Sequence, residues 1–499
     1  MDIKIWQDKI KQKRKQTEFR QFLKEIVSWC PIVFNKNSWY ISRYPQTDRI
    51  KWLIPLSEFE ENRDLVNKND DYDFNLDFFQ NFQKIFQNIK FPPHISHGAS
   101  ENTDFTDTII WSKNVYLSTI VVAECENVLY SFQVVQNSTN IFNCIFSWDN
   151  SSNLYMCNSV FRSYNVFFSK YLDNCADIRF CSNLIWCKEC IFCDGLENKS
   201  YCIDNKEYTK DEFFIRKQEI LKNKQKFMSY FTSMDVMPRN YWAENCTWQS
   251  VTFSKSVENA FLVEYVNNGR NVVWCWWEST NLYDTFDVWI HSNDVFAIEW
   301  WWYYSQNIYC GSQVENCSNV YYSYFMNECS FCLGCVWLKN KSYCILNKQY
   351  SEAERYDLVE KIFKQMEEQW ILWEFFPWYI NPFYFNDTIA YVMNDSFSKN
   401  EVENQWYLRR DEAIKVDIPV GLEVVKTEDL NKYQWFNSEW KWNINPEILK
   451  KVIKDEKWDI YRIVNMEYEF LKKYELPLPD LHWLNRMKLH FKSLNIDLK

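Results

Sequence analysis

The chain has 499 residues, enough for about two to four domains, and it is acidic, with a formal net charge of −11. This charge argues against a dedicated nucleic-acid-binding protein. The first residues, MDIKIWQDKIKQKRK, lack the apolar core of a signal peptide, and no apolar run reaches the roughly 18 residues of a membrane helix. We therefore expect a cytoplasmic protein whose 18 cysteines are not paired in disulfides.

The glycine and tryptophan contents are both abnormal. Average usage of about 7% predicts roughly 35 glycines, whereas the chain has 6 glycines and 26 tryptophans. Some bacterial lineages read the codon UGA as glycine. We hypothesise that this reading frame was translated with UGA as tryptophan, under an alternative genetic code, so that many of these tryptophans are glycine in the natural protein. The competing interpretation is a chain that is truly rich in tryptophan.

Residues 1–100 are predicted to form a helical and mixed region. Apolar residues at helical spacing predict a charged amphipathic helix over residues 4–28, and its basic start, KIKQKRK, is interpreted as a solvated face rather than a nucleic-acid contact. A second helix is predicted from phenylalanines four residues apart, at Phe74, Phe78, Phe82 and Phe86.

A short repeat begins at about residue 101. An Asn or Asp followed by an aliphatic residue recurs every 12 or 13 residues, at Asn114-Val115, Asn127-Val128, Asn140-Ile141, Asn153-Leu154, Asn165-Val166 and Asp177-Ile178. A period of this length, with β-forming residues and no helical spacing, predicts small coils stacked as a parallel β-solenoid. Asn and Asp tolerate left-handed corners and can form hydrogen-bonded ladders between coils, and the aliphatic residue after each corner is predicted to point inward.

The repeat itself is duplicated. Residues 187–208 and 329–350 share the cysteine spacing C-x2-C-x2-C-x8-C at an offset of 142 positions, and Gly195 in the first copy aligns with Trp337 in the second. Each cysteine motif precedes a predicted capping helix, over 209–233 and 351–372. Capping boxes are predicted at Thr209 with Glu212 and at Ser351 with Glu354. The second copy shows the corner repeat at Asn259-Ala260, Asn271-Val272, Asn281-Leu282, Asp294-Val295, Asn307-Ile308 and Asn319-Val320.

The two cysteine quartets are the only specific constellation in the sequence. Four thiolates from one short segment can complete a tetrahedral zinc site, and an iron–sulfur cluster is the weaker variant because the C-x3-C-P end of a ferredoxin run is missing. The alternatives are that the cysteines form a core ladder, since cysteine is small and apolar, or that a thiol is reactive. The predicted metal ligands are Cys187, Cys190, Cys193, Cys202, Cys329, Cys332, Cys335 and Cys344.

These patterns divide the chain into 1–100, a first module over 101–235, a second over 236–373, and a C-terminal α+β region over 374–499. The last region is predicted to hold a hairpin at 453–464, a short helix with Ile448, Val452 and Ile453, and a helix with Met466, Phe470 and Leu471.

Several tracts resemble a family of uncharacterised Cys-rich repeat proteins from ultra-small bacteria with reduced genomes. The resemblance lies in YDFNLDFFQNFQ (72–83), ENTDFTDTIIWSKNVYLS (101–118), GCVWLKNKSYCILNKQYS (334–351), EFFPWYINPF (374–383) and YEFLKKYELPLPDLHWLNRMKLHF (468–491). Family members read GCVGLxNKxYCIxNKxY, which implies glycine where Trp337 stands. Many members carry a terminal zinc-ribbon-like CxxC pair, but here His482 occupies the first cysteine position, so any such ribbon is degenerate. Some relatives carry an acyl-CoA transferase label, which no feature of this sequence matches.

Together the sequence predicts a mainly β protein with flanking helices: two tandem short-coil parallel β-solenoid modules, each followed by an amphipathic capping helix, and α+β terminal regions. The long faces of such modules favour a structural or interaction scaffold for a protein or glycan partner, with no membrane or nucleic acid involved. A carbohydrate-active β-helix enzyme is the alternative. No acidic pair repeats in phase along the coils, and His291 near Asp294 is interpreted as a rung pair, so no catalytic or cofactor-binding residue is predicted.

Overall fold

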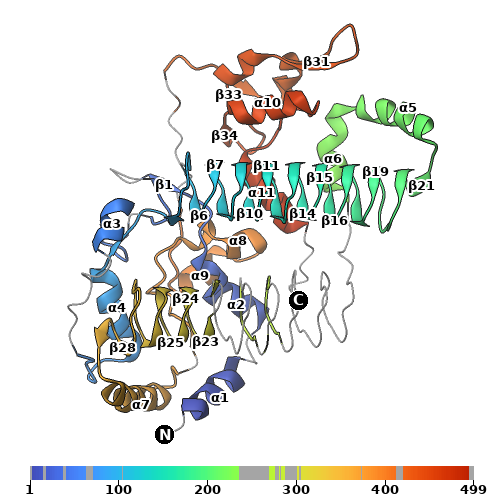
Figure 1. Cartoon of the computed structure of the whole chain (residues 1–499). Helices are drawn as coiled ribbons and strands as arrows, with labels where there is room; N and C mark the ends of the chain where they lie inside the picture. The colour runs from blue at the N-terminus through green and yellow to red at the C-terminus, as the bar shows by residue number, and fades with distance from the viewer. Residues whose placement is uncertain are drawn as a thin grey trace. The chain divides into compact units, whose positions relative to one another are not determined.

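A computed structural model describes residues 3–14, 18–36, 41–45, 47–62, 71–103, 105–234, 269–275, 282–286, 305–372, 374–411 and 420–493, the pair 301–302, and residues 280 and 418. The chain forms two compact units. Unit 1 comprises Met1–His94, Met237–Arg410 and Asp497–Lys499, and unit 2 comprises Ile95–Val236 and Asp411–Ile496. Each unit therefore joins one solenoid to segments that are distant from it in sequence (Figure 1).

Unit 2 contains the first solenoid, which confirms the predicted fold. Its short strands form a parallel sheet of eight strands and a second sheet of nine, in which only the terminal pair is antiparallel. The first sheet contains β5 (Ser96–His97), β6 (Asp107–Ile110), β8 (Thr119–Val122), β10 (Phe132–Val135), β12 (Ile145–Trp148), β14 (Asn158–Phe161), β16 (Lys170–Asp173) and β18 (Ser182–Ile185). The second contains β7 (Lys113–Tyr116), β9 (Glu126–Leu129), β11 (Thr139–Phe142), β13 (Ser152–Tyr155), β15 (Tyr164–Phe167), β17 (Ala176–Arg179), β19 (Lys188–Ile191), β20 (Ser200–Ile203) and β21 (Lys206–Glu207).

The rungs turn at left-handed residues that recur every third position. One rung turns at Asn153, Met156, Ser159 and Arg162, with φ between 47° and 58°. Where the repeat is 13 residues long, a second left-handed residue is added at one corner, as in Gln136-Asn137 and Asp149-Asn150. The difference between steps of 12 and 13 residues is therefore one extra residue at a single corner. The inward positions on the other three sides stay in register with those of the neighbouring rungs.

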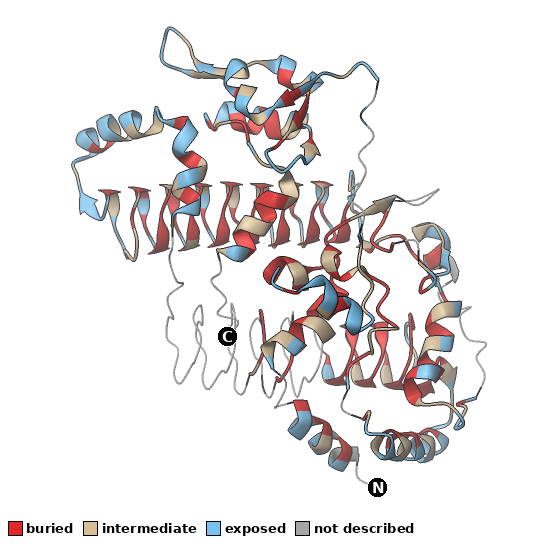
Figure 2. Ribbon diagram, turned by 180° about the vertical axis from the view of Figure 1, so that it is seen from behind, coloured by how far each residue is buried: buried red, intermediate tan, exposed pale blue. Residues whose placement is uncertain are grey.

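The predicted asparagine ladder is present, and it runs along one corner of the first solenoid. Each side-chain amide donates to the side-chain oxygen of the next rung at 2.9–3.0 Å. The ladder comprises Asn102, Asn114, Asn127, Asn140, Asn153, Asn165 and Asp177, all with positive φ. The aliphatic residue after each corner is buried, as predicted, and exposes 1% or less of its surface: Val115, Val128, Ile141, Leu154, Val166 and Ile178. Figure 2 shows most of the rungs of this solenoid in the colour of buried residues.

The first capping helix starts as predicted but is broken in two. Thr209 and Glu212 form the capping box of α5 (Lys210–Leu221). The chain then passes through a short 3-10 helix, η3 (Lys224–Lys226), into α6 (Phe227–Thr232). A single helix over 209–233 is therefore wrong. The break lets Phe213 of α5 pack on Tyr201 at the rung end, while Phe227 of α6 packs on the aromatic face of the rungs at Phe168 and Phe180.

The C-terminal module, residues 420–493, completes unit 2. It contains β30 (Val424–Lys426), η5 (Thr427–Tyr433), β31 (Gln434–Phe436), β32 (Trp442–Ile444), η6 (Pro446–Lys450), β33 (Val452–Lys454), β34 (Ile460–Tyr461), α10 (Asn465–Lys473) and α11 (Trp483–Lys492). The predicted hairpin is present as β33 and β34. The predicted short helix with Val452 and Ile453 is wrong, because both residues pair with β30 in a parallel strand. The module packs on the solenoid through Phe470, whose ring lies 4.3 Å from that of Phe142.

Unit 1 contains the second solenoid together with helices that precede it and helices that follow it in the sequence. The solenoid strands are β22 (Trp301–Trp302), β23 (Gln306–Tyr309), β24 (Ser312–Glu315), β25 (Ser318–Tyr321), β26 (Tyr324–Asn327), β27 (Ser330–Leu333), β28 (Cys344–Ile345) and β29 (Lys348–Gln349). The corner repeats at Asn259-Ala260 and Asp294-Val295, and His291, lie outside the described residues, as does Asn281. Asn307 donates to Asn319 at 3.1 Å, so the asparagine ladder recurs here.

The remaining elements of unit 1 surround this solenoid. They are α1 (Ile3–Arg14), α2 (Phe19–Glu25), η1 (Val27–Trp29), β1 (Asn35–Lys36), β2 (Ile41–Ser42), β3 (Trp52–Leu53), α3 (Leu56–Asn62), α4 (Phe78–Asn88), β4 (Lys90–Phe91), α7 (Glu352–Glu368), η4 (Phe385–Asp387), α8 (Ile389–Met393) and α9 (Lys399–Asn404). The helix predicted over 4–28 is thus two helices and a 3-10 turn. Phe74 lies outside α4, which begins at a capping box between Asp77 and Gln80. Ser351 and Glu354 form the predicted capping box of α7.

Tryptophan occupies backbone positions that favour glycine. Outside the two solenoids, five described non-glycine residues have positive φ, and four of them are tryptophan: Trp370, Trp406, Trp440 and Trp458, with Glu475 as the fifth. Trp370 and Trp406 directly follow the C-caps of α7 and α9, where glycine is the usual residue. All four tryptophan side chains are at least 68% exposed, so burial does not explain their presence. Gly195 and its aligned partner Trp337 are both left-handed.

Candidate functional site

The coil geometry accounts for the cysteine spacing. Every third residue points into the rung, so C-x2-C-x2-C places Cys187, Cys190 and Cys193 on three successive inward positions. Cys202 then stacks on Cys190 as its strand partner. All eight predicted metal ligands are buried in the described solenoid cores, with exposed fractions of 2% or less, among aliphatic residues such as Ile178.

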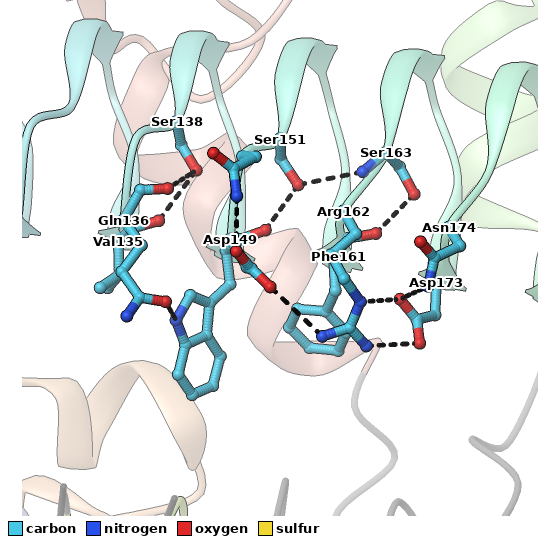
Figure 3. A network of polar contacts seen from close by, with 12 residues as sticks. Val135, Gln136, Ser138, Asp149, Ser151, Phe161, Arg162, Ser163, Asp173 and Asn174 are labelled. Atoms are coloured by element: carbon cyan, nitrogen blue, oxygen red, sulfur yellow. Dashed lines mark hydrogen bonds and ion pairs between the residues drawn. The ribbon is translucent and has the colours of Figure 1, made fainter. Parts of the chain in front are cut away.

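Cysteine and serine both occupy two of the inward columns, and they make the same hydrogen bonds to backbone carbonyls. Figure 3 shows one column at Ser138, Ser151 and Ser163, whose hydroxyls donate to carbonyls two or three residues back at 2.6–2.9 Å. The next member, Cys175, donates its thiol to the Asp173 carbonyl at 3.2 Å, and its own N–H donates to Ser163 Oγ at 2.9 Å. A cysteine in these columns therefore replaces a serine without changing the hydrogen-bond pattern.

The duplication contains one such replacement. Cys181 in the first solenoid corresponds to Ser323 in the second, at the offset of 142 positions. Cys181 Sγ accepts the N–H of Cys193 at 3.2 Å, and Ser323 Oγ accepts the N–H of Cys335 at 3.0 Å. The two residues perform the same structural role in the two copies.

The eight cysteines of the quartets are free thiols that donate hydrogen bonds to backbone carbonyls. Contacts between neighbouring thiols shift their pKa values in both directions, and the pKa is lowered for Cys187, Cys193, Cys329 and Cys344. Burial raises the pKa of Cys125 to about 12, and the pKa of Cys332 is raised well above its ordinary value by hydrogen bonds from Cys329, Cys335 and Cys344 together with burial. Among the described residues, which include all eight predicted ligands, no group of three or more His, Cys, Asp or Glu side chains is arranged to hold a metal ion. Metal binding by the quartets remains a prediction.

The helices that follow the two quartets differ in their charges. In the first copy, Phe213 packs on Tyr201, and Lys217 pairs with Glu189 at 2.6 Å. In the second copy Arg355 stands at the position of Phe213. Its side chain is fully buried, and none of its three guanidinium nitrogens has a hydrogen-bond partner. Burial lowers the pKa of Arg355, and the Cys332 and Cys335 thiols are among the groups that act on it electrostatically.

Unit 2 contains a cavity of about 770 Å³ that the sequence did not predict. Three segments line it: the solenoid face, the connection between α5 and α6, and the C-terminal module. The lining residues are Tyr155, Phe168, Lys222, Asn223, Lys224, Gln225, Met228, Thr427, Leu430, Asn431, Gln434, Trp435, Phe436, Trp442, Pro477, Leu478, Pro479 and Asp480. The cavity combines aromatic walls with a few charged groups, which is the usual composition of a small-molecule site.

Lys224 is the unusual residue of this cavity. Its side chain is 4% exposed, and its Nζ donates a 2.6 Å hydrogen bond to the carbonyl oxygen of Glu475 at the end of α10. Its Nζ also lies 5.2–5.8 Å from the ring centres of Phe227, Phe436 and Trp442. Burial and the nearby Arg179 guanidinium lower the pKa of Lys224 to about 7. In the sequence it belongs to the basic run KNKQK, which gave no signal of burial.

A buried ion pair fixes the C-terminal module beside this cavity. Arg486 of α11 donates to Glu467 of α10 at 2.9 Å and to the Tyr155 hydroxyl at 3.3 Å, and the charged side chains are at most 1% exposed. Tyr155 belongs both to this network and to the cavity wall. The position of this wall residue is therefore fixed by a buried hydrogen bond.

Another corner of the same solenoid carries an exposed network of ion pairs centred on Arg162. Arg162 donates two hydrogen bonds to Asp173, at 2.9 and 2.6 Å, and a third to Asp149 at 3.4 Å (Figure 3). Exposed pairs of this kind contribute little stability.

A scan against protein-family models and searches of curated proteins and of solved structures found no match to this chain. The fold itself places the chain among the parallel β-solenoids. In the described part of the chain, no helix combines the length and the apolar character that a membrane span requires.

Proposed function

We propose that this β-solenoid protein is a binding scaffold, in which the first solenoid supports the C-terminal module and the cavity between them receives a ligand. The cavity is the observation that carries the proposal. Its walls come from segments more than 250 residues apart in sequence, Tyr155 and Thr427 among them. Stacked rungs contact only their neighbours along the coil and form a regular support.

The test uses an uncharged fluorescent probe, N-phenylnaphthylamine, with the full chain. We expect saturable binding at one site, with slower hydrogen exchange in residues 222–228 and 427–442. Asn431→Trp fills the exposed mouth of the cavity and should abolish binding, whereas Asn150→Trp, at an exposed corner away from the cavity, should not. Binding that persists in Asn431→Trp, or protection elsewhere in the chain, would contradict the proposal.

A thiolate metal site in the second solenoid is the second candidate, and Arg355 favours it. A tetrathiolate zinc site carries a net charge of −2, and a buried guanidinium without an acceptor would offset part of it. Phe213 occupies the equivalent position near the first quartet and offers no such charge. Metal binding would require the thiols to leave their present hydrogen bonds.

The measurement is zinc and iron content per chain after anaerobic purification. We expect metal that is lost in Cys332→Ser and retained in Cys190→Ser. Absence of metal from the unsubstituted chain would remove this candidate. A protein or glycan partner for the solenoid faces, and membership of the Cys-rich repeat family, remain predictions.

A further inference from the structure

We propose that the cavity of unit 2 selects an anionic ligand that carries a flat apolar group, and that Lys224 is the counter-ion. This inference rests on the proposed binding function and specifies its ligand class.

Lys224 is buried without an ion-pair partner in the described structure, and the Glu475 carboxylate acts on it only from a longer distance. Its one hydrogen bond in the described structure is to a neutral acceptor, the Glu475 carbonyl oxygen, and no acidic side chain lies within 4 Å of its Nζ. Transfer of an ammonium group from water to such a site carries a large desolvation cost. The contrast with Lys217 of α5 is direct, because that lysine reaches Glu189 at 2.6 Å. A bound anion would supply the missing opposite charge.

The charged groups that line the cavity have an excess of positive charge, and the Glu475 carboxylate, which acts on Lys224, is not part of the lining. Lys222 and Lys224 line the cavity together with one carboxylate, Asp480. Arg179 of β17 acts on Lys224 electrostatically and lowers its pKa. Arg179 Nη1 is itself buried without a hydrogen-bond partner. The excess positive charge in a partly desolvated space favours an anion over a neutral or cationic ligand.

The wall specifies the rest of the ligand. Tyr155 and Phe168 come from the solenoid face, and Phe436 and Trp442 come from the C-terminal module. Pro477 and Pro479 add rigid apolar surface. Aromatic rings contribute most when they contact a flat apolar group, so the favoured ligand combines such a group with a carboxylate, sulfonate or phosphate.

Lys224 also has a structural alternative, which is to cap the end of α10 through the Glu475 carbonyl. That role would make Lys224 important for stability but not for the choice between charged and uncharged ligands. The two roles therefore differ in a binding measurement that compares two probes with the same rings.

The experiment compares anilinonaphthalenesulfonate with N-phenylnaphthylamine, which has the same rings without the sulfonate, by fluorescence titration of the full chain at pH 6. We expect the sulfonate to bind at least tenfold more tightly. Lys224→Met should remove this preference while leaving the neutral probe bound. Lys226→Met, an exposed lysine of the same 3-10 helix, should retain the preference.

The outcomes separate the two proposals. If Asn431→Trp blocks both probes but Lys224→Met keeps the preference for the sulfonate, the cavity binds ligands and the assignment of Lys224 is wrong. If Asn431→Trp blocks neither probe, the binding function itself is wrong. A Lys224→Met chain that melts at a lower temperature but retains the preference would assign Lys224 to the cap of α10 alone.

Discussion

Replacement of Trp370 by glycine should stabilise the end of α7. Trp370 follows the C-cap residue Gln369, has φ of 63°, and closes the helix by hydrogen bonds from Trp370 N–H to the Glu367 carbonyl and from Ile371 N–H to the Met366 carbonyl. A side chain with a Cβ costs roughly 1–2 kcal/mol in this left-handed conformation, and glycine avoids that cost. The greater freedom of glycine in the unfolded chain offsets about 0.5–1 kcal/mol.

The comparison that isolates the backbone is Trp370→Gly against Trp370→Ala. Both substitutions remove the indole ring, which is 70% exposed, and only alanine retains the Cβ. We expect glycine to be more stable than alanine by about 1 kcal/mol, which corresponds to roughly fivefold slower hydrogen exchange of residues 362–372. Native-state exchange read by mass spectrometry measures this local opening directly.

A tryptophan in an extended backbone provides the control. Trp52 on β3 is 58% exposed and has no positive φ, so Trp52→Gly should weaken its strand. Equal exchange in Trp370→Gly and Trp370→Ala would refute the backbone argument. Mass spectrometry of peptides from the natural protein then tests the codon hypothesis itself, because tryptophan at positions 337 and 370 would reject it.

Three further predictions concern unit 2. Burial and Lys170 lower the pKa of His490 from 6.5 to about 3, so between pH 6.5 and pH 3 the folded state binds fewer protons than the unfolded state. The protein should therefore lose about 2 kcal/mol of stability when the pH falls from 7 to 5. Urea unfolding measures this loss, and His490→Leu should reduce it. Cys181→Ser should change stability by less than about 1 kcal/mol, whereas Cys181→Val, which leaves the buried Cys193 N–H without an acceptor, should cost about 1–3 kcal/mol in thermal unfolding. Asn140→Gly should cost about 1–2 kcal/mol of stability because two hydrogen bonds of the asparagine ladder are lost. Asn140→Ala should cost about 1 kcal/mol more, because alanine is strained at the φ of 56° that this position requires. Equal losses for the two variants would contradict the claim that this corner favours left-handed residues.

The local repeat was predictable because one rung needs only its neighbours. A corner residue, an inward aliphatic residue and a period of 12 or 13 define the coil without reference to the rest of the chain. The capping boxes at Thr209 and Ser351 were equally local. The break between α5 and α6 was not predictable, since it depends on two different surfaces, the rung end at Tyr201 and the aromatic face at Phe180.

The cavity could not be predicted from the sequence for a related reason. Lys224 lies in a run of lysines that is typical of a solvated helix end, and only the C-terminal module, more than 200 residues later, buries it. Hydrophobic periodicity shows that α10 must pack on something. It does not identify the partner surface, so neither the contact of Phe470 with the first solenoid nor the resulting cavity could be derived from the pattern.

The two quartets also show how a duplicated element can diverge without loss of its fold. The first cap pairs Lys217 with Glu189 and fills the rung end with Phe213. At the matching positions the second cap has Val359, Phe331 and Arg355. At these three positions each copy thus has one cation, but in the second copy the cation occupies the apolar position and the carboxylate is replaced by Phe331. A buried guanidinium without an acceptor opposes folding. The cysteines of the two quartets share one spacing and one geometry, so the position of the cation distinguishes the two quartets more sharply than the cysteines do.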